Sequence, residues 1–382
     1  MAELVRRGHS VSILTSDANH LVQPPVFDGH CFREDISGVR IHWLKTLKYF
    51  GVKSVRRILS WLHFEWRLIT MRKVELDVPD VVVVSSLSLL TVLTGVWWKW
   101  RYRSALIFEV RDIWPLTLTE EGGFSPLNPL VIALGLVEKI GYRCSDAVVG
   151  TMPNLVDHVR SVSGSSRPVF CIPMGLDSGA LLDPPELPDG YAEKNIPTDK
   201  FIVAHVGSIG ATNALDTFFE AAEALWGNSY IHLLLVGDGD LRAAYEARYG
   251  HLQNVTFAPK VAKSHVPAVL ENCDLLYFSV HASKVWDYGQ SLNKVIDYMS
   301  AGKPILASYG GFPSMINEAG CGEFVPPSDA AALVAAIKRF CDLTGDERNE
   351  VGARGRKWLL ENRRYPLLAE QYEAIMRRLI EQ

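Results

Sequence analysis

The sequence predicts an α/β fold of two doubly wound domains, each built on a parallel sheet. Short apolar runs rich in β-branched residues alternate with helical patterns along the whole chain. The runs are continuously apolar, which indicates strands buried on both faces, as in parallel sheets covered by crossover helices. A length of 382 residues, nearly half of them hydrophobic, is enough for two domains of ordinary size.

The predicted strands form two groups. The stretch 177–190, rich in Pro and Asp, reads as the linker between them. We therefore expect one domain at 1–174 and a second at 175–362, facing a central cleft where ligands bind at the carboxyl ends of the strands. A last helix at 363–382 is expected to pack back on the first domain. The strands are expected at 11–15, 39–43, 81–85, 105–110, 146–150 and 168–173, then at 201–207, 231–237, 255–258, 274–279, 304–308 and 323–326.

Composition and charge narrow the class of protein. The chain has no run of about 18 apolar residues, so no membrane-spanning helix is predicted. Its six cysteines form no CxxC pair and no cluster with His, which indicates a reducing cytoplasm and no structural zinc. Residues 1–176 carry 20 Lys and Arg against 16 Asp and Glu, whereas the remainder carries 19 against 27. A basic first half and an acidic second half suggest domains with different neighbours.

The segment 291–306 gives the strongest local indication of a ligand. It reads as a helix that ends at Gly302 and leads at once into a buried strand. Lys294 and, one turn later, Asp297 share a face of this helix. A helix N-terminus suits a phosphate, and a carboxylate one turn in can hold two vicinal hydroxyls. Phosphate and diol together outline a nucleotide, and the alternative is a surface helix with a Lys–Asp pair.

A basic amphipathic segment at 53–73 suggests a membrane surface. It carries six Lys and Arg against one Glu, with two Trp and one Phe, which is typical of a helix on anionic lipid. The alternative is a core-facing helix whose cations are only solvated. For the similar segment 97–103 that alternative is favoured, because the helix must also cover a sheet.

Several segments, taken together, resemble one family. They are 6–16, 108–118, 144–159, 171–177, 205–222, 233–242 and 288–306. In order and spacing they resemble a retaining glycosyltransferase of family 4, which has the GT-B fold of two Rossmann-like domains. The likeness is nearest to the bacterial capsule and O-antigen branch, whose members transfer sugars such as N-acetylfucosamine.

The resemblance implies a reaction and a setting. The expected reaction is retaining transfer of a sugar from a nucleoside-diphosphate donor, a UDP-sugar, to a lipid-linked (polyprenyl diphosphate) or glycan acceptor in surface polysaccharide synthesis. No metal and no further cofactor are expected. The protein is expected in the cytoplasm, peripherally on the inner membrane, with no nucleic-acid partner.

The resemblance also implies how the second domain holds the donor. Asp297 occupies the position of the carboxylate that binds the ribose hydroxyls. Gly289 stands where many members carry a Glu that contacts the donor sugar. The diphosphate is expected to meet the residues that enter the helix, which are Gly289, Gln290, Ser291, Asn293 and Lys294.

A glycine turn, Gly207-Ser208-Ile209-Gly210, implies a second part of the diphosphate site, since glycine lets backbone approach a phosphate closely. Many members place an Arg and a Lys here, at the positions of Ser208 and Asn213. Two cations are therefore missing, and Lys294 or Arg111 is expected to compensate. The alternative is a simple tight turn between strand and helix.

In the first domain, the strand 105–110 delivers Arg111 and Asp112 to the cleft. Family members often carry a His where Arg111 stands. A guanidinium stays charged at any working pH and can stabilise the departing diphosphate. Asp112 is expected to orient Arg111 or to meet an acceptor hydroxyl. The alternative for both is a buried ion pair that closes a loop.

Other interpretations stay open. The family begins with a strand and a Gly-rich loop before its first helix, whereas Met1 falls inside that helix, so we expect this beginning to precede Met1. A sugar-nucleotide epimerase of the same architecture would need acid–base groups, for which His205 and His281 are the weak candidates. A non-catalytic partner subunit would explain the replaced Glu, Arg and Lys.

Overall fold

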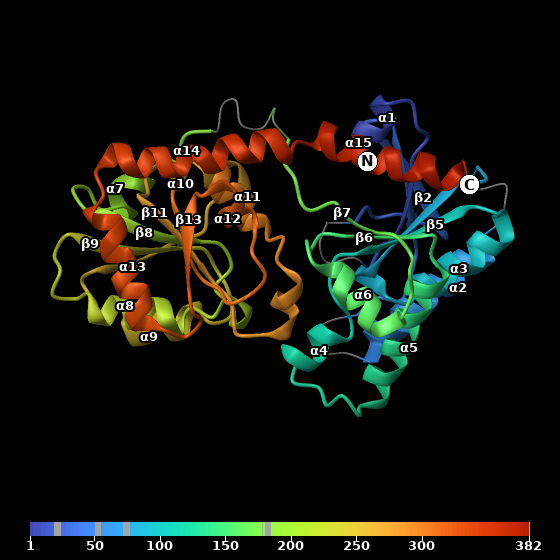
Figure 1. Cartoon of the computed structure of the whole chain (residues 1–382), viewed down its shortest axis with the longest axis horizontal. Coiled ribbons are helices and arrows are strands. Elements are labelled where there is room, and N and C mark those ends of the chain that lie inside the picture. Colours follow the sequence, from blue (N-terminus) through green and yellow to red (C-terminus); the bar gives the residue numbers. More distant parts are fainter. Residues whose placement is uncertain (19–23, 50–54, 72–76, 178, 180–184, 382) are drawn as a thin grey trace. The chain divides into compact units, whose positions relative to one another are not determined.

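The computed structural model describes all residues except 19–23, 50–54, 72–76, 178, 180–184 and 382 (Figure 1). It divides into two compact units, Met1–Ile172 with Tyr365–Gln382, and Pro173–Arg364. Each unit is an α/β body with its own core, so the predicted fold class is confirmed. Part of the expected linker, residues 178 and 180–184, lies outside the described residues.

Unit 2 is built on a six-stranded sheet in the order β10-β9-β8-β11-β12-β13. Every neighbouring pair in it is parallel. The first strand of the unit, β8, lies in the middle of the sheet. The next two strands are added on one side of β8, and the last three, beginning with β11, are added on its other side. The strands are β8 (Phe201–Val206), β9 (Ile231–Val236), β10 (Val255–Ala258), β11 (Leu275–Ser279), β12 (Ile305–Ser308) and β13 (Gly322–Val325).

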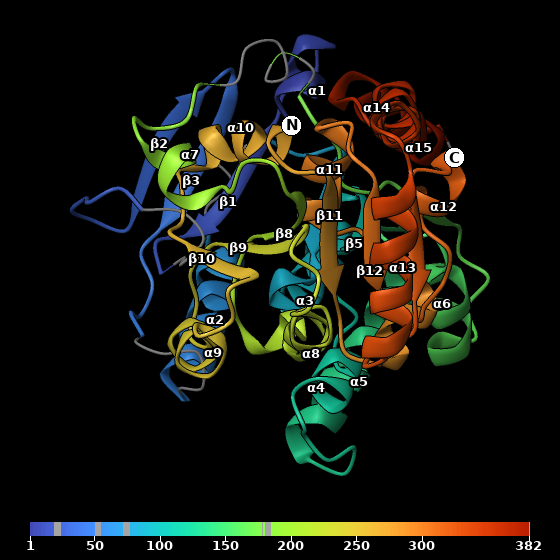
Figure 2. The same cartoon turned by 90° about the vertical axis from the view of Figure 1, so that its left-hand side faces the viewer.

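Helices cover both faces of this sheet. One hydrophobic cluster joins the strands to α10, α11, α12 and α14, and another joins them to α8, α9 and α13. Figure 2 shows α10 and α11 on one side of the strands and α8 and α9 on the other. The helices are α7 (Tyr191–Asn195), α8 (Asp216–Ala224), α9 (Arg242–Tyr249), α10 (Val266–Glu271), α11 (Asn293–Ser300), α12 (Met315–Ala319), α13 (Ala330–Asp342) and α14 (Gly345–Asn362), with short 3₁₀ turns η4 (Ala211–Asn213), η5 (Lys263–His265) and η6 (Lys284–Tyr288).

Unit 1 contains two smaller sheets. Strands β4 (Val81–Ser85), β5 (Ala105–Val110), β6 (Ala147–Gly150) and β7 (Val169–Cys171) form a parallel sheet in that order. In the second sheet, β3 (Val39–Leu44) lies between β1 (Ser12–Ser16), which is parallel to it, and β2 (Cys31–Ile36), which is antiparallel. Strand β2 and its antiparallel pairing with β3 were not predicted from the sequence.

Residues of β5 alternate between two helical layers, as the period of a strand requires. Phe108 contacts α5 at Gly141, and Leu106 contacts α3 at Gly95. Ile107, between them, packs with Ile375 of α15 on the opposite face. The helices of this unit are α1 (Ala2–Arg6), α2 (Val55–Thr70), α3 (Thr91–Tyr102), α4 (Leu116–Glu120), α5 (Pro129–Cys144), α6 (Leu155–Ser163) and α15 (Tyr365–Ile380), with the 3₁₀ turn η2 (Ser86–Ser88).

The C-terminal helix α15 belongs to unit 1, as predicted. It lies beside α1 and covers β5 and β6 (Figure 1). The hydroxyl of Tyr372 donates to the Glu109 carboxylate over 2.8 Å, and Glu373 accepts from Arg7 over 2.5 Å. Helix α15 therefore holds both to the sheet and to the first residues of the chain.

Close packing of α14 on the end of α11 gives a test of this core. Gly302, at φ +66°, ends α11, and a Cβ added to Gly352 of α14 would lie 1.9 Å from the Gly302 carbonyl oxygen. We expect Gly352→Ala to lower the free energy of unfolding by about 2 kcal/mol or more, because backbone must move apart. Gly345→Ala, where a Cβ meets no atom within 4 Å, is the control on the same helix and is expected to have almost no effect in urea unfolding. Equal effects of the two changes would show that the close contact does not exist.

Candidate functional site

The topology of unit 2 selects one place for a ligand. In an open parallel sheet, ligands bind outside the carboxyl ends of the strands, where the strand order reverses. Here that place lies beyond β8 and β11. The segments that follow these strands are joined there: Ser279 donates its hydroxyl to the Asn213 carbonyl over 2.6 Å, and His281 bonds the Ala211 carbonyl over 2.7 Å.

The glycine turn after β8 is locked against the turn after β9. Ile209 donates its N–H to the Asp238 carbonyl over 2.9 Å, and a Cβ on Gly237 would lie 1.8 Å from the carbonyl oxygen of Gly207. A Cβ on Gly239 would lie 2.2 Å from the Ile209 carbonyl oxygen. Two backbones therefore touch, and glycines 237 and 239 are explained by this contact rather than by a ligand.

Lys294 of α11 reaches into this turn. Its amine donates to the side-chain oxygen of Asn213, and it lies 3.9 Å from where a Cβ of Gly207 would be. Burial lowers the pKa of the Lys294 amine to about 8. Among the described residues, no carboxylate forms an ion pair with it. The structure thus places a cation beside Asn213, the position where the resemblance implies a Lys that this chain lacks.

The two histidines weighed for acid–base chemistry have structural partners. His205 is fully buried in β8, and burial, followed by the charge of Lys294, lowers its pKa to about 3. Its Nε2 bonds the Ser208 carbonyl over 3.3 Å, so the neutral ring supports the glycine turn. His281 holds the Ala211 carbonyl of η4. Each ring thus has a structural hydrogen-bond partner at its Nε2 atom.

The entry to α11 combines an open helix N-terminus with a buried donor. Gly289, at φ +99°, ends η6 and redirects the chain. The Oε1 atom of Gln290 accepts from the Leu292 N–H over 3.1 Å, whereas its buried Nε2 has no hydrogen-bond partner within the described part of the chain. Ser291 accepts from the Met174 N–H over 3.0 Å, and Asn293 is exposed at the first helical position. Of these residues, Gln290 offers a donor that still needs an acceptor.

Asp297 lies one turn further along α11 and is partly exposed. It forms an ion pair with Lys263 of η5, and not with Lys294. The Lys–Asp pair within the helix, which was the alternative interpretation of this segment, is therefore not formed. Instead, Lys294 contacts η4 and Asp297 contacts η5. Lys263 was missed in the sequence because it is 34 residues away from Asp297 and follows a different strand.

Arg111 and Asp112 follow β5 of unit 1, and their N–H groups both donate to the buried Ser86 hydroxyl, over 2.9 and 3.1 Å. The Arg111 Nε atom lies 3.9 Å from the Glu109 carboxylate, so Arg111 is on the side of the strand that faces α15. Asp112 has an exposed side chain, yet desolvation by nearby atoms raises the pKa of its carboxyl. The charge of Arg111 lowers this pKa, but by less than desolvation raises it. Ser86, which fixes this turn, was not predicted.

No metal site is found in the described part of the chain. Groups of three or more His, Cys, Asp or Glu that might hold an ion are absent there. The aspartates at 238 and 240 sit on the locked turn, where Asp238 pairs with Lys260 over 3.0 Å. That the reaction needs no metal stays a prediction.

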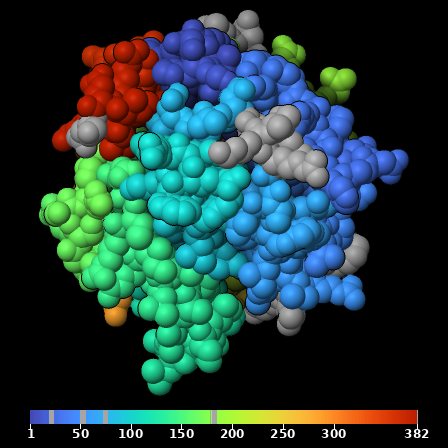
Figure 3. Space-filling model, turned by 90° about the vertical axis from the view of Figure 1, so that its right-hand side faces the viewer, coloured from blue at the N-terminus to red at the C-terminus, as the bar shows by residue number. Residues whose placement is uncertain are grey.

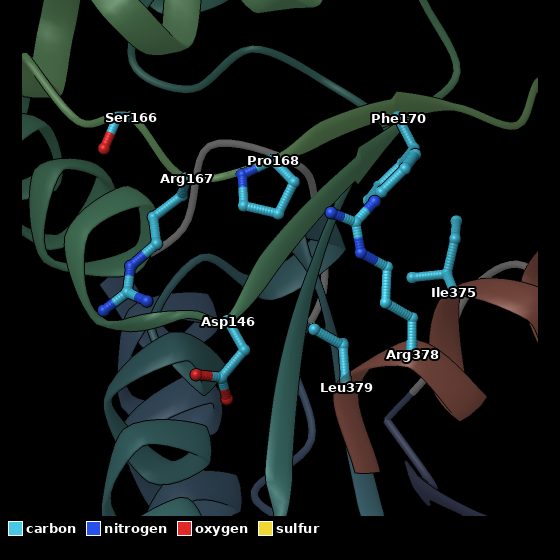
Figure 4. A pocket seen from close by; sticks show the side chains of 8 residues that line it. All are labelled: Asp146, Ser166, Arg167, Pro168, Phe170, Ile375, Arg378 and Leu379. Atoms are coloured by element: carbon cyan, nitrogen blue, oxygen red, sulfur yellow. The ribbon is translucent and has the colours of Figure 1, made fainter. Parts of the chain in front are cut away.

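A cavity of about 280 Å³ lies elsewhere, between β7 and α15 of unit 1 (Figure 4). Asp146 and Pro168, which line it, directly precede β6 and β7, so it opens at the amino ends of these strands. Arg111 and Asp112 follow the carboxyl end of β5 instead. No predicted donor-site residue lines this cavity.

Comparison with known families identifies the class of protein. Residues 1–175 match the family described as Glycosyl transferase 4-like domain, and residues 200–342 match Glycosyl transferases group 1. The chain is a glycosyltransferase. The two matches together span most of its length. No curated protein sequence matches the chain.

Solved structures of this glycosyltransferase's fold have low sequence identity to it. Sucrose-phosphate synthase from Thermosynechococcus elongatus is 19% identical, with all of this chain and 91% of that chain covered at a TM-score of 0.72. A trehalose-6-phosphate protein from E. coli bound with UDP-2-fluoro glucose is 12% identical, with 100% and 94% covered, at 0.72. Anabaena HepE in complex with UDP-glucose is 13% identical, with 89% and 86% covered, at 0.63. The fold is therefore GT-B.

The buried amine of Lys294 predicts a pH dependence of ligand binding. Its pKa of about 8 means that the amine is protonated below that pH and neutral above it. A diphosphate pairs with the protonated form, so we expect the affinity for a nucleoside diphosphate, measured with UDP as the probe, to fall as pH rises through 8, with proton uptake on binding above it. Calorimetric titration with UDP in buffers of different ionisation heat measures both effects.

The matching variants separate ligand binding from stability. Lys294→Met should weaken UDP binding about tenfold or more and remove the pH dependence. It should leave the unfolding temperature unchanged or raised, because it removes a buried charge. Lys338→Met, on the exposed face of α13, is the control. Unchanged affinity in the Lys294 variant would return that lysine to a structural role.

Proposed function

We propose that this glycosyltransferase transfers a sugar from a UDP-sugar, with retention of configuration, to a lipid-linked or glycan acceptor. The observation that carries the proposal is the largely buried amine of Lys294, whose hydrogen-bond acceptor among the described residues is the uncharged Asn213 of η4. A buried cation without a counterion is costly unless a ligand supplies one. Solved structures of the same fold contain UDP or UDP-glucose, which supports this donor class.

In this proposal three groups of unit 2 hold the diphosphate. The Lys294 ammonium supplies the charge, the backbone N–H groups at the start of α11 supply donors, and the unpaired Nε2 of Gln290 supplies one more. Gly207, Ser208 and Gly210 allow the phosphates to lie against the turn. Asp297 accepts hydrogen bonds from the ribose hydroxyls, for which it must turn from Lys263 or share it.

The retaining reaction needs no pair of carboxylates. Departure of the diphosphate leaves an oxocarbenium-like sugar, and the acceptor attacks from the same face while the leaving phosphate takes its proton. The protein must then stabilise negative charge on the leaving group, which Lys294 and the helix N-terminus do. We propose that Arg111 adds positive charge in the transition state and that Asp112 orients it or meets the acceptor hydroxyl.

The wider role proposed here is bacterial surface polysaccharide synthesis, of capsule or O-antigen. The donor sugar is proposed to be an N-acetylamino sugar, and the acceptor a sugar on polyprenyl diphosphate. Such an acceptor stays at the cytoplasmic face of the inner membrane, where the segment 53–73 would make peripheral contact. Residues 53, 54, 72 and 73 of that segment lie outside the described residues. No described helix is long and apolar enough to cross a bilayer.

A donor screen tests the reaction. Nucleotide release from a panel of UDP-sugars, with polyprenyl diphosphate-linked acceptors, should require both substrates and give a product with the anomeric configuration of the donor. Arg111→Ala should slow release about a hundredfold while UDP affinity is kept; the exposed Arg103→Ala is its control. An epimeric sugar nucleotide formed without acceptor would instead indicate an epimerase. Absence of UDP binding at millimolar concentration would indicate a non-catalytic subunit.

The ribose contact has a test of its own. Wild-type protein should bind UDP about tenfold more tightly than 2′-deoxy-UDP, because a hydrogen bond to a charged group is lost. In Asp297→Ala this preference should disappear, whereas Lys263→Ala, which frees the carboxylate, should keep it. A preference that survives in Asp297→Ala would place the ribose elsewhere.

A further inference from the structure

Three neighbouring helices of unit 1 form one outward surface. Helix α3 contacts both α2 and α5, and all three cover the same side of this unit (Figure 3). Trp98 and Val92 of α3 are buried, as a sheet-covering helix requires. Trp100 on the same helix is 81% exposed, so α3 has both an inner and an outer apolar side. We call the outward surface of α2, α3 and α5 the helical face.

Apolar side chains dominate the helical face, although solvent-facing positions of a surface helix are normally polar. On α2 the exposed residues at helical spacing are Leu59, Leu62, Trp66 and Ile69, with Trp66 56% exposed. On α5, Ile132, Leu136 and Ile140 form an equivalent stripe. Single exposed hydrophobic residues are common, whereas aligned stripes on adjacent helices indicate a partner.

The charges of these helices are sorted between inside and outside. Both carboxylates are turned inward: Glu65 accepts from Thr91 and Thr94, and Glu138 bonds the ring of His158 over 2.7 Å. Both are buried. Among the described residues of α2, α3 and α5, no exposed residue is acidic, whereas arginines at 56, 101 and 143 are exposed.

The tryptophans of the helical face lie next to cations. The guanidinium of Arg67 is 5.7 Å from the Trp66 ring centroid, and that of Arg101 is 5.0 Å from the Trp97 ring. A Trp beside an Arg suits the boundary between acyl chains and headgroups, because the ring enters the boundary while the guanidinium stays with the phosphates.

We propose that the helical face docks this protein on an anionic lipid surface. The proposal deepens the lipid-linked acceptor of the proposed function by naming the surface involved, which includes α3 and α5 besides α2. A second copy of the chain fits less well, because a twofold contact would set these cations against each other. A lipid bilayer instead offers apolar depth for the stripes and negative charge for the arginines.

Co-sedimentation with vesicles tests the helical face. The full chain should bind vesicles that contain phosphatidylglycerol and should bind vesicles of phosphatidylcholine alone at least about tenfold more weakly at low salt. The double variant Leu62→Ser, Trp66→Ser should lose at least about tenfold in binding, as should Leu136→Ser with Ile140→Ser. All four side chains are exposed, so folding should be kept.

Matched controls separate docking from catalysis. Trp226→Ser, at 54% exposure in unit 2, should leave vesicle binding unchanged. Lys139→Glu on α5 should weaken it, whereas Lys338→Glu on α13 should not. Asp297→Ala should keep vesicle binding while it impairs UDP binding, so failure of the donor site does not imply failure of the docking surface.

Two results would overturn the proposal. One is binding that is the same for neutral and anionic vesicles or is unaffected by the serine variants. The other is an absence of vesicle binding together with a dimer, seen by analytical ultracentrifugation, that the Leu62→Ser, Trp66→Ser variant dissociates. The second result would assign the helical face to a copy of this chain.

Discussion

The contact between two glycine turns is the constraint on which the donor site depends. Without Cβ atoms at positions 237 and 239, the loops after β8 and β9 meet backbone to backbone, and Ile209 donates its N–H to the Asp238 carbonyl. Next to this contact, hydrogen bonds from Ser279 and His281 to the Asn213 and Ala211 carbonyls hold η4 against the segment that follows β11. Lys294, entering from α11, finds its hydrogen-bond acceptor only because η4 is held there. Backbone packing and these hydrogen bonds, rather than any single charged pair, thus position the Lys294 amine and its acceptor.

In the candidate site, a positive charge comes from a different element than the resemblance implies, although it lies beside the same position. The resemblance places a Lys at position 213, on the turn after β8, and this chain has Asn213 instead. The amine arrives from α11, and the amide of Asn213 becomes its acceptor. Desolvation lowers the pKa of Lys294, and a nearby negative charge would raise this pKa again. A cation therefore lies beside position 213 although the residue at that position is uncharged.

The fold was predictable because buried parallel strands appear in the sequence as continuous apolar runs. The end of α11 at Gly302 was also predictable, from the glycine itself. Strand β2 was not predictable in this way, since its sequence Cys-Phe-Arg-Glu-Asp-Ile is largely exposed and lacks an apolar run. In the candidate site, residues on one segment, such as Lys294 and Asp297, could be proposed from their spacing alone. Their partners Asn213 and Lys263 lie on other strand–loop units, and only the folded sheet brings these together.

The charge difference between the two halves of the sequence has a structural counterpart in unit 1. In helices α2, α3 and α5, the two carboxylates, Glu65 and Glu138, accept hydrogen bonds from inside the unit. Burial raises the pKa of Glu65. Carboxylates are normally found on the outer surface of a helix, because water solvates their charge there. Their placement inside removes negative charge from the one face that is also rich in exposed Leu, Ile and Trp. The apolar stripes and the burial of both carboxylates are separate features of the sequence. The stripes favour removal from water, and the absence of exposed carboxylates from the described residues of these helices favours contact with an anionic surface.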